Sequence, residues 1–305
     1  MARRAAAIRG RRKGRIRTAA VAFLLALGGL ACLPGAAQQG APERPERVVS
    51  INACTDQLLF ALADRDQIAA LTHYAVEDDF SIFTSEVKAS GVPLMRGSAE
   101  EVLKLKPDLV LAGTFTRRAT RELLAQHGIK LALFPPSKNV EETKAAIRQA
   151  AQLLGRKDRG EVLIAEIDGA LAAAPSLSSR NLSILQLQRR GFVSGPDTLL
   201  GDLLTRLGVA NAAERMGLKG VSRSSVEAAL KVKADALVLF DPSARATDQG
   251  TALLQHPALA DAYPPERRVI LPGRLLVCGG PALPLAIAAL TDGLNPLTPR
   301  AAGRQ

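Results

Sequence analysis

Two cysteines in the body of the chain, Cys54 and Cys278, carry its most distinctive side-chain chemistry. Each follows a short apolar run that is typical of a strand. In an oxidising compartment the two thiols favour pairing as a disulfide. Two free thiols could instead ligate a metal centre, or bind the metal of a bound complex. If the two residues lie too far apart, neither arrangement forms. The sequence leaves these three alternatives open.

Polar and aromatic residues follow several predicted strands, where ligand contacts gather in parallel α/β sheets. Tyr74 could cover a flat ligand face with its ring, or be a rim tyrosine that touches no ligand. Arg189 and Arg190 could pair with ligand carboxylates or phosphates, or form a solvated arginine pair. The predicted ligand-binding residues are Asn52, Cys54, Tyr74, Phe115, Arg189, Phe192 and Cys278.

Histidine placement and short motifs argue against catalysis and against a resident metal. The three histidines are scattered, so a His-rich zinc or manganese site is not expected. The chain lacks GxGxxG, Walker and G-x-S-x-G motifs. A Cys54/His73 nucleophile–base pair is conceivable, but no third orienting group is evident. We therefore predict a non-enzymatic protein without a cofactor of its own. The alternative is an exported metal-delivery chaperone or a thiol-dependent enzyme that uses Cys54 and Cys278.

Strands and helices alternate along most of the chain, which predicts an α/β fold with parallel-rich sheets. The expected strands are 47–51, 68–71, 109–112, 129–134, 181–187 and 269–271, with another ending at Phe240. The expected helices are 57–63, 116–127, 139–154, 158–174, 198–207 and 282–290. Thr55 is expected to cap the first helix. No Gly/Ser-rich linker separates the halves, so we expect helix 158–174 to be a stiff spacer.

A helix–turn–strand unit occurs twice, at 98–112 (SAEEVLKLKPDLVLA) and at 225–239 (SVEAALKVKADALVL). Six positions coincide without a gap. They are Ser98/Ser225, Glu100/Glu227, Leu103/Leu230, Lys104/Lys231, Lys106/Lys233 and Asp108/Asp235. Capping explains the serines, and Ser98/Glu101 and Ser224/Glu227 have capping-box spacing. Glu227 could therefore be only a cap partner, whereas Glu101 already holds that position beside Glu100.

The N-terminus has the pattern of an export signal at 1–37, followed by a flexible leader at 38–46. Eight basic residues and no acid precede an apolar run at 19–33, and small residues lead to Ala37. Lipid anchoring at Cys32 is not expected, because Gly29 stands where a lipobox prefers leucine. Removing the signal lowers the net charge from +11 by those eight charges. The small remaining charge argues against nucleic-acid binding.

Four segments in order, at 47–63, 96–113, 195–211 and 225–239, resemble the periplasmic substrate-binding proteins of importers for cobalamin, ferric siderophores and haem. The resemblance implies two small α/β lobes, here 47–154 and 179–305, joined by one long helix at 155–178. It places the ligand in a cleft between the lobes and makes the protein a periplasmic, monomeric receptor. The cobalt or iron would belong to the bound metal–organic complex.

In that family one glutamate on each lobe docks onto arginines of the permease dimer of an inner-membrane ABC importer. Motif alignment places those glutamates at Glu100 and Glu227. The repeat and the resemblance thus select the same pair. Which complex is bound stays open between a corrinoid, a ferric siderophore and haem. The absence of tryptophan removes the usual stacking platform for a large macrocycle.

Overall fold

The computed structural model describes residues 44–240 and 253–300. The predicted signal peptide and most of the predicted leader lie outside these ranges. Two leader residues that are described are bound to the fold. Arg44 pairs with Asp64, and the backbone N–H of Glu46 donates to Asp108, 2.7 Å away.

The first lobe is built on a five-stranded sheet in the order β3-β2-β1-β4-β5, in which every pair is parallel. Its strands are β1 Val48–Ser50, β2 Ile68–Thr72, β3 Leu94–Met95, β4 Leu109–Gly113 and β5 Leu131–Phe134. Its helices are α1 Ala53–Leu62, α2 Thr84–Ser90, α3 Ala99–Lys104, α4 Arg118–Gln126 and α5 Val140–Leu153. β1 and β4 are buried along their whole length, as the central strands of a sheet covered on both faces must be.

The second lobe contains a parallel sheet in the order β11-β10-β6-β8 and a separate antiparallel ribbon, β7-β9. The strands are β6 Ser183–Gln186, β7 Phe192–Ser194, β8 Ala210–Asn211, β9 Val221–Arg223, β10 Ala236–Phe240 and β11 Arg268–Leu271. The helices are α7 Leu199–Arg206, α8 Val226–Lys231, α10 Pro257–Ala262 and α11 Leu283–Leu294. The α/β fold of two parallel-sheet lobes is as predicted.

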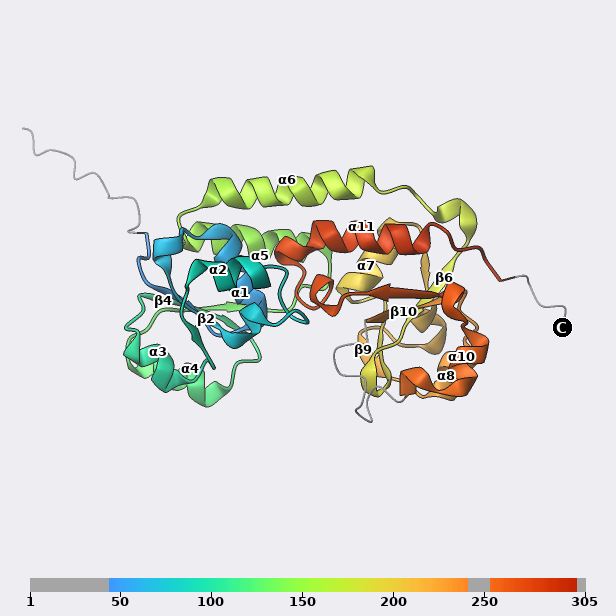
Figure 1. Cartoon of the computed structure of the whole chain (residues 1–305), viewed down its shortest axis with the longest axis horizontal. Coiled ribbons are helices and arrows are strands. Elements are labelled where there is room, and N and C mark those ends of the chain that lie inside the picture. Colours follow the sequence, from blue (N-terminus) through green and yellow to red (C-terminus); the bar gives the residue numbers. More distant parts are fainter. Residues whose placement is uncertain (1–43, 241–252, 301–305) are drawn as a thin grey trace, which may run out of the picture. The chain divides into compact units, whose positions relative to one another are not determined.

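A long helix, α6 Lys157–Ala173, connects the lobes and packs against α5 and α11 (Figure 1). Gly160, Leu163, Ile164 and Ile167 form its buried side. The segment Lys157–Arg180 is long and apolar enough to span a membrane by composition. Because one side of α6 packs against α5 and α11, we describe it as the helix that connects the lobes and not as a membrane span.

One hydrophobic core runs through both lobes, because residues of α1 and α5 share a cluster with residues of α7 and α11. Leu58, Ile147, Leu203 and Leu290 are buried members from those four helices. The start of α6 is also fastened to the first lobe, since Arg159 donates to the carbonyls of Leu62 and Ala63 at the end of α1. The inter-lobe region is therefore packed rather than open.

The repeated aspartates perform the same structural task in each lobe. The Asp108 carboxylate accepts the backbone N–H of Arg47, at the start of β1. The Asp235 carboxylate accepts the backbone N–H of Ser183, at the start of β6, at 2.7 Å. The residues two positions before them, Lys106 and Lys233, both have positive φ angles, 46° and 49°. The duplication thus includes a tight turn and a carboxylate that holds the neighbouring strand.

Two helical glycines, one in the first turn of α7 and one inside α6, allow a prediction with opposite signs. A Cβ atom at Gly201, in α7, would lie 2.4 Å from the Pro196 carbonyl oxygen, whereas one at Gly169, in α6, would meet nothing within 4 Å. We expect Gly201→Ala to lower the free energy of unfolding by about 1–3 kcal/mol through overpacking. Gly169→Ala should raise it by about 0.5–1 kcal/mol, because alanine favours a helix interior. Urea unfolding of both variants tests this, and equal signs would contradict it.

Candidate functional site

The first turn of α1 organises the candidate site. Asn52 is its N-cap, and its side-chain oxygen accepts the backbone N–H groups of Cys54 at 2.9 Å and Thr55 at 3.4 Å. The expectation that Thr55 caps a helix starting at Gln57 is therefore wrong, because Asn52 satisfies these N–H groups first. Cys54 lies inside the helix, and Thr55 is buried, with its hydroxyl 2.7 Å from that of Ser50.

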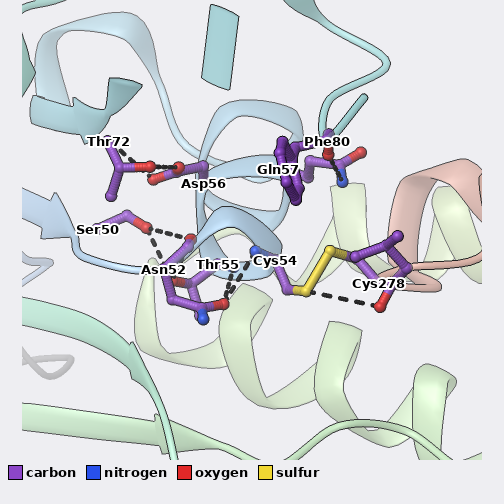
Figure 2. The surroundings of a disulfide bond; sticks show 10 residues. Ser50, Asn52, Cys54, Thr55, Asp56, Gln57, Thr72, Phe80 and Cys278 are labelled. Atoms are coloured by element: carbon purple, nitrogen blue, oxygen red, sulfur yellow. Dashed lines mark hydrogen bonds between the residues drawn. A yellow bond between two sulfur atoms is a disulfide. The ribbon is translucent and has the colours of Figure 1, made fainter. Parts of the chain in front are cut away.

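Cys54 and Cys278 form a disulfide between the two lobes, with their Cα atoms 5.0 Å apart (Figure 2). Of the three alternatives open at the sequence level, the structure therefore has the disulfide. Both sulfur atoms are consumed in this bond. Neither is a thiolate nucleophile or a metal ligand in this form.

A cavity of about 130 Å³ lies beside the disulfide and takes its walls from both lobes. We call it the cleft cavity. The predicted residues Asn52, Cys54, Phe115 and Cys278 line it together. Residues that we did not predict complete it, and they include Pro135, Pro136, Ser137, Thr143, Leu199 and Leu276.

A larger hollow of about 730 Å³ on the first lobe shares Asn52 and Phe115 with the cleft cavity. We call it the outer hollow. Tyr74 lines it, with its ring 4.0 Å from that of His73 and 5.0 Å from that of Phe80. Phe115 is 86% exposed, an unusual state for a large apolar side chain. Exposed Arg96, Arg117 and Glu100 also line it, so the wall combines aromatic rings with two positive charges and one negative charge.

The other two predicted ligand residues lie on the second lobe and line neither space. Arg189 precedes β7, and Phe192 begins it, with the Arg223 guanidinium carbon 5.7 Å from the centre of the Phe192 ring. No strand was expected in this region, but β7 pairs with β9 there. The antiparallel ribbon fixes Phe192 beside Arg223. A ligand role for Arg189 and Phe192 stays a prediction.

A buried carboxylic acid, Asp56, connects the first turn of α1 to the end of β2. It accepts the backbone N–H of Thr72 at 3.1 Å and contacts the Thr72 hydroxyl, directly before His73 and Tyr74 (Figure 2). Burial raises the pKa of Asp56 to about 7, although hydrogen bonds from Ser50 and Thr72 partly lower it. Asp56 therefore ties the disulfide-bearing turn to the strand end that carries Tyr74.

The raised pKa of Asp56 predicts that part of the protein's stability is lost as pH rises. The acid has a pKa near 3.8 when unfolded and about 7 when folded. Between these values the folded chain holds a proton that the unfolded chain releases, so the contribution is complete below pH 4 and lost as pH rises through 7. From pH 5 to 7, the unfolding free energy of the wild type should fall by roughly 2–3 kcal/mol relative to that of Asp56→Asn. Parallel stability curves, measured by urea unfolding, would contradict this.

The glutamates selected by the repeat occupy equivalent positions. Ser98 and Ser225 cap α3 and α8, and Glu100 and Glu227 are the second residues of those helices, both exposed. The Ser98/Glu101 capping box is present, whereas the expected Ser224/Glu227 box is not, because Ser225 is the cap. A hydrogen bond from the Ser225 hydroxyl lowers the pKa of Glu227.

Some of the missed lining residues had a sequence signal and others had none. Residues 135–137 directly follow the strand 129–134, so the strand-end rule that selected Phe115 selects them too. Thr143 and Leu199 reach the cleft cavity from α5 and α7. Their place depends on how the helices of two lobes pack, and no local pattern reports that.

Two parallel-sheet lobes joined by one helix, with a cavity between them, define a two-lobed substrate-binding protein. A family model described as "Periplasmic binding protein" matches residues 48–270. The chain belongs to this family. The family and its structural relatives are substrate-binding proteins and not enzymes, so the thiol-dependent enzyme considered from the sequence is excluded.

Solved structures and curated relatives agree with this assignment. The apo periplasmic haem-binding protein of Roseiflexus sp. RS-1 is 27% identical, with a TM-score of 0.65, covering 81% of this chain and 98% of that one. The vitamin B12-binding protein of Vibrio cholerae has the same fold, at 14% identity and a TM-score of 0.59, covering 82% and 97% of the two chains. A cobalamin-binding protein of Halobacterium salinarum is 25% identical over 173 residues, 55% of this chain. That match spans 46% of the relative, about half its length.

Proposed function

We propose that this protein is the periplasmic receptor of an inner-membrane ABC importer and that it captures a metal–organic complex for delivery. The observation that carries the proposal is the junction of the outer hollow with the cleft cavity at Asn52 and Phe115. Together they form a concave, largely apolar site with a few polar groups, as ligand sites generally do. Relatives named for haem and for cobalamin binding support a ligand of this class.

The chemistry of the outer hollow favours a flat ligand that carries acidic groups. Tyr74 and Phe115 offer ring faces to a flat complex, and the guanidinium groups of Arg96 and Arg117 can pair with carboxylates at its edge. Haem combines a flat apolar body with two carboxylates, so it is the first probe. A corrinoid and a ferric siderophore are the other members of the proposed class.

Export by residues 1–37, a monomeric state and a permease dimer as partner complete the proposal. Glu100 and Glu227 are the proposed contacts with that dimer. Their equivalent positions on α3 and α8, one in each lobe, support this role. Nucleic acid is not a proposed partner, because most of the net positive charge lies in the proposed signal.

Absorbance titration and native mass spectrometry with haemin, cyanocobalamin and a ferric hydroxamate test the proposal. We expect one of the three to form a one-to-one complex. Tyr74→Ala and Phe115→Ala should each weaken that complex about tenfold, since an aromatic contact contributes about 1 kcal/mol beyond burial. Val162→Ala is a control, because Val162 is 61% exposed on α6 and lines neither space. Failure of all three probes to bind, or aromatic variants that bind like wild type, would overturn the proposal.

A further inference from the structure

The loop formed by residues 272–280 of the second lobe supplies one wall of the cleft cavity. Leu276, Val277, Cys278 and Gly280 of this loop line the cavity. A covalent bond and a hydrogen bond join the loop to the first lobe. One is the Cys54–Cys278 disulfide, and the other is a 3.2 Å hydrogen bond from the Arg274 guanidinium to the Asp78 carbonyl oxygen.

The two ends of the disulfide differ in how firmly they are held. The Cys54 end belongs to the first turn of α1, where the Thr55 hydroxyl meets Ser50 at 2.7 Å and the carbonyl of Leu111 at 3.3 Å. The Cys278 end is followed by Gly279 and Gly280, whose φ angles are 64° and 59°. Glycine adopts these positive φ angles without strain and has access to other backbone regions too, so the backbone at these two positions is restrained by packing and not by side chains of its own. The disulfide therefore connects a firmly hydrogen-bonded helix turn to a segment that begins with the buried Leu275 and ends with two glycines.

The disulfide is within reach of a reductant. Cys54 and Cys278 are both half-buried and line the cleft cavity, and the neighbouring Val277 is 46% exposed. A thiolate can therefore approach one of the sulfur atoms and exchange through a mixed disulfide. The chain contains one further cysteine, Cys32, which lies in the proposed signal.

We propose that the Cys54–Cys278 disulfide makes ligand retention redox-dependent: the oxidised receptor holds its ligand, and reduction by a protein dithiol releases it. In this step the sulfur–sulfur bond breaks and the dithiol forms its own disulfide. Two electrons and two protons pass from the dithiol to Cys54 and Cys278, which become thiols. The inference rests on the proposed function, since it concerns the same ligand site.

The physical basis is loss of a preorganised wall. In the oxidised form the loop is ordered before ligand arrives, so binding does not have to order it. In the reduced form the Arg274 hydrogen bond and the buried Leu275 still anchor the loop, while Val277 and Cys278 lose their covalent tie and ligand binding must restore their part of the wall. We expect the dissociation constant to rise at least tenfold. By thermodynamic reciprocity, bound ligand makes the disulfide harder to reduce by the same factor, which is about 30 mV for a two-electron couple.

The test uses the full chain with Cys32→Ser, so that Cys54 and Cys278 are its only cysteines. Haemin and cyanocobalamin are titrated into three samples: the oxidised protein, the reduced protein and the Cys54→Ser/Cys278→Ser variant. We expect the variant to bind as weakly as the reduced protein, without any reductant that could act on the probe. Reoxidation of the reduced sample should restore affinity. Equal affinity of the oxidised protein and the double variant would overturn the proposal.

Hydrogen exchange separates this inference from the proposed function. Reduction should increase amide exchange in the 272–280 loop, while the first turn of α1 stays protected. This readout needs no ligand, so it remains decisive if neither probe binds, an outcome that would count against the proposed ligand class. Unchanged exchange in the loop would overturn the redox inference alone.

Discussion

Reversing the charge of Glu100 or Glu227 to arginine is expected to abolish ligand-stimulated transport, and Glu227→Arg is expected to leave ligand affinity unchanged. Both side chains are exposed at the second position of a short helix, one in each lobe. Neither lines the cleft cavity, but Glu100 lines the outer hollow, so Glu227→Arg is the variant in which both parts of the ligand site keep their walls. If arginines of the permease bind these carboxylates, the new arginine places two positive charges against each other, and like charges at an interface cost several kcal/mol.

Folding should survive both substitutions. An acid in the first turn of a helix contributes about 0.3–1 kcal/mol through the helix dipole, which is small against the stability of a domain. Glu86→Arg is the matched control, because Glu86 is also exposed in the first turn of a helix, α2, and has no match in the repeat. Ligand uptake and importer ATPase activity are the measurements. Normal transport with both Glu100→Arg and Glu227→Arg would remove the docking assignment.

Replacing both cysteines by serine is expected to lower the free energy of unfolding by about 4–5 kcal/mol. The disulfide joins residues separated by 224 positions, and the entropy that a cross-link removes from the unfolded chain grows with loop length. The expected loss is a large share of the roughly 5–15 kcal/mol that stabilises a typical protein. Chemical denaturation of the oxidised protein and of the Cys54→Ser/Cys278→Ser variant measures it.

The control for this prediction is a reductant. Reduction should destabilise the wild-type protein to the level of the double variant and should leave the variant unchanged. A variant as stable as the oxidised protein would show that the packing between lobes, rather than the cross-link, holds them together. This measurement is independent of ligand affinity, so it does not depend on the redox inference.

Helices with strong local signals were predicted to within a residue or two. Asn139 and Thr198, where two of the expected helices begin, are the N-caps of α5 and α7, because a side-chain oxygen before an apolar-periodic run satisfies the first free N–H groups wherever the helix packs. The β7-β9 ribbon was missed for the opposite reason. Phe192 pairs with Arg223 across 31 positions of sequence, and neither short strand has an alternating pattern that marks it alone.

The residues of the candidate site were likewise predictable from the sequence only in part. Strand ends in a parallel sheet converge at one edge, so sequence order alone selected Asn52, Cys54, Phe115 and Cys278, which line one cavity. The same rule also selected Arg189 and Phe192, which line neither that cavity nor the outer hollow. A strand end marks an edge of its own sheet, and it carries no information about how two sheets face each other.

The amino-acid sequence by itself determined the α/β architecture, the duplicated unit and the family resemblance, because periodicity, caps and motifs are local properties of the chain. Only the tertiary structure decided that Cys54 and Cys278 pair, since a disulfide depends on a Cα–Cα distance of 5.0 Å between residues in different lobes. The tertiary structure also determines the cleft cavity, whose walls include Thr143 and Leu199. Contacts between distant segments follow from packing of the whole core, which no single stretch of sequence encodes.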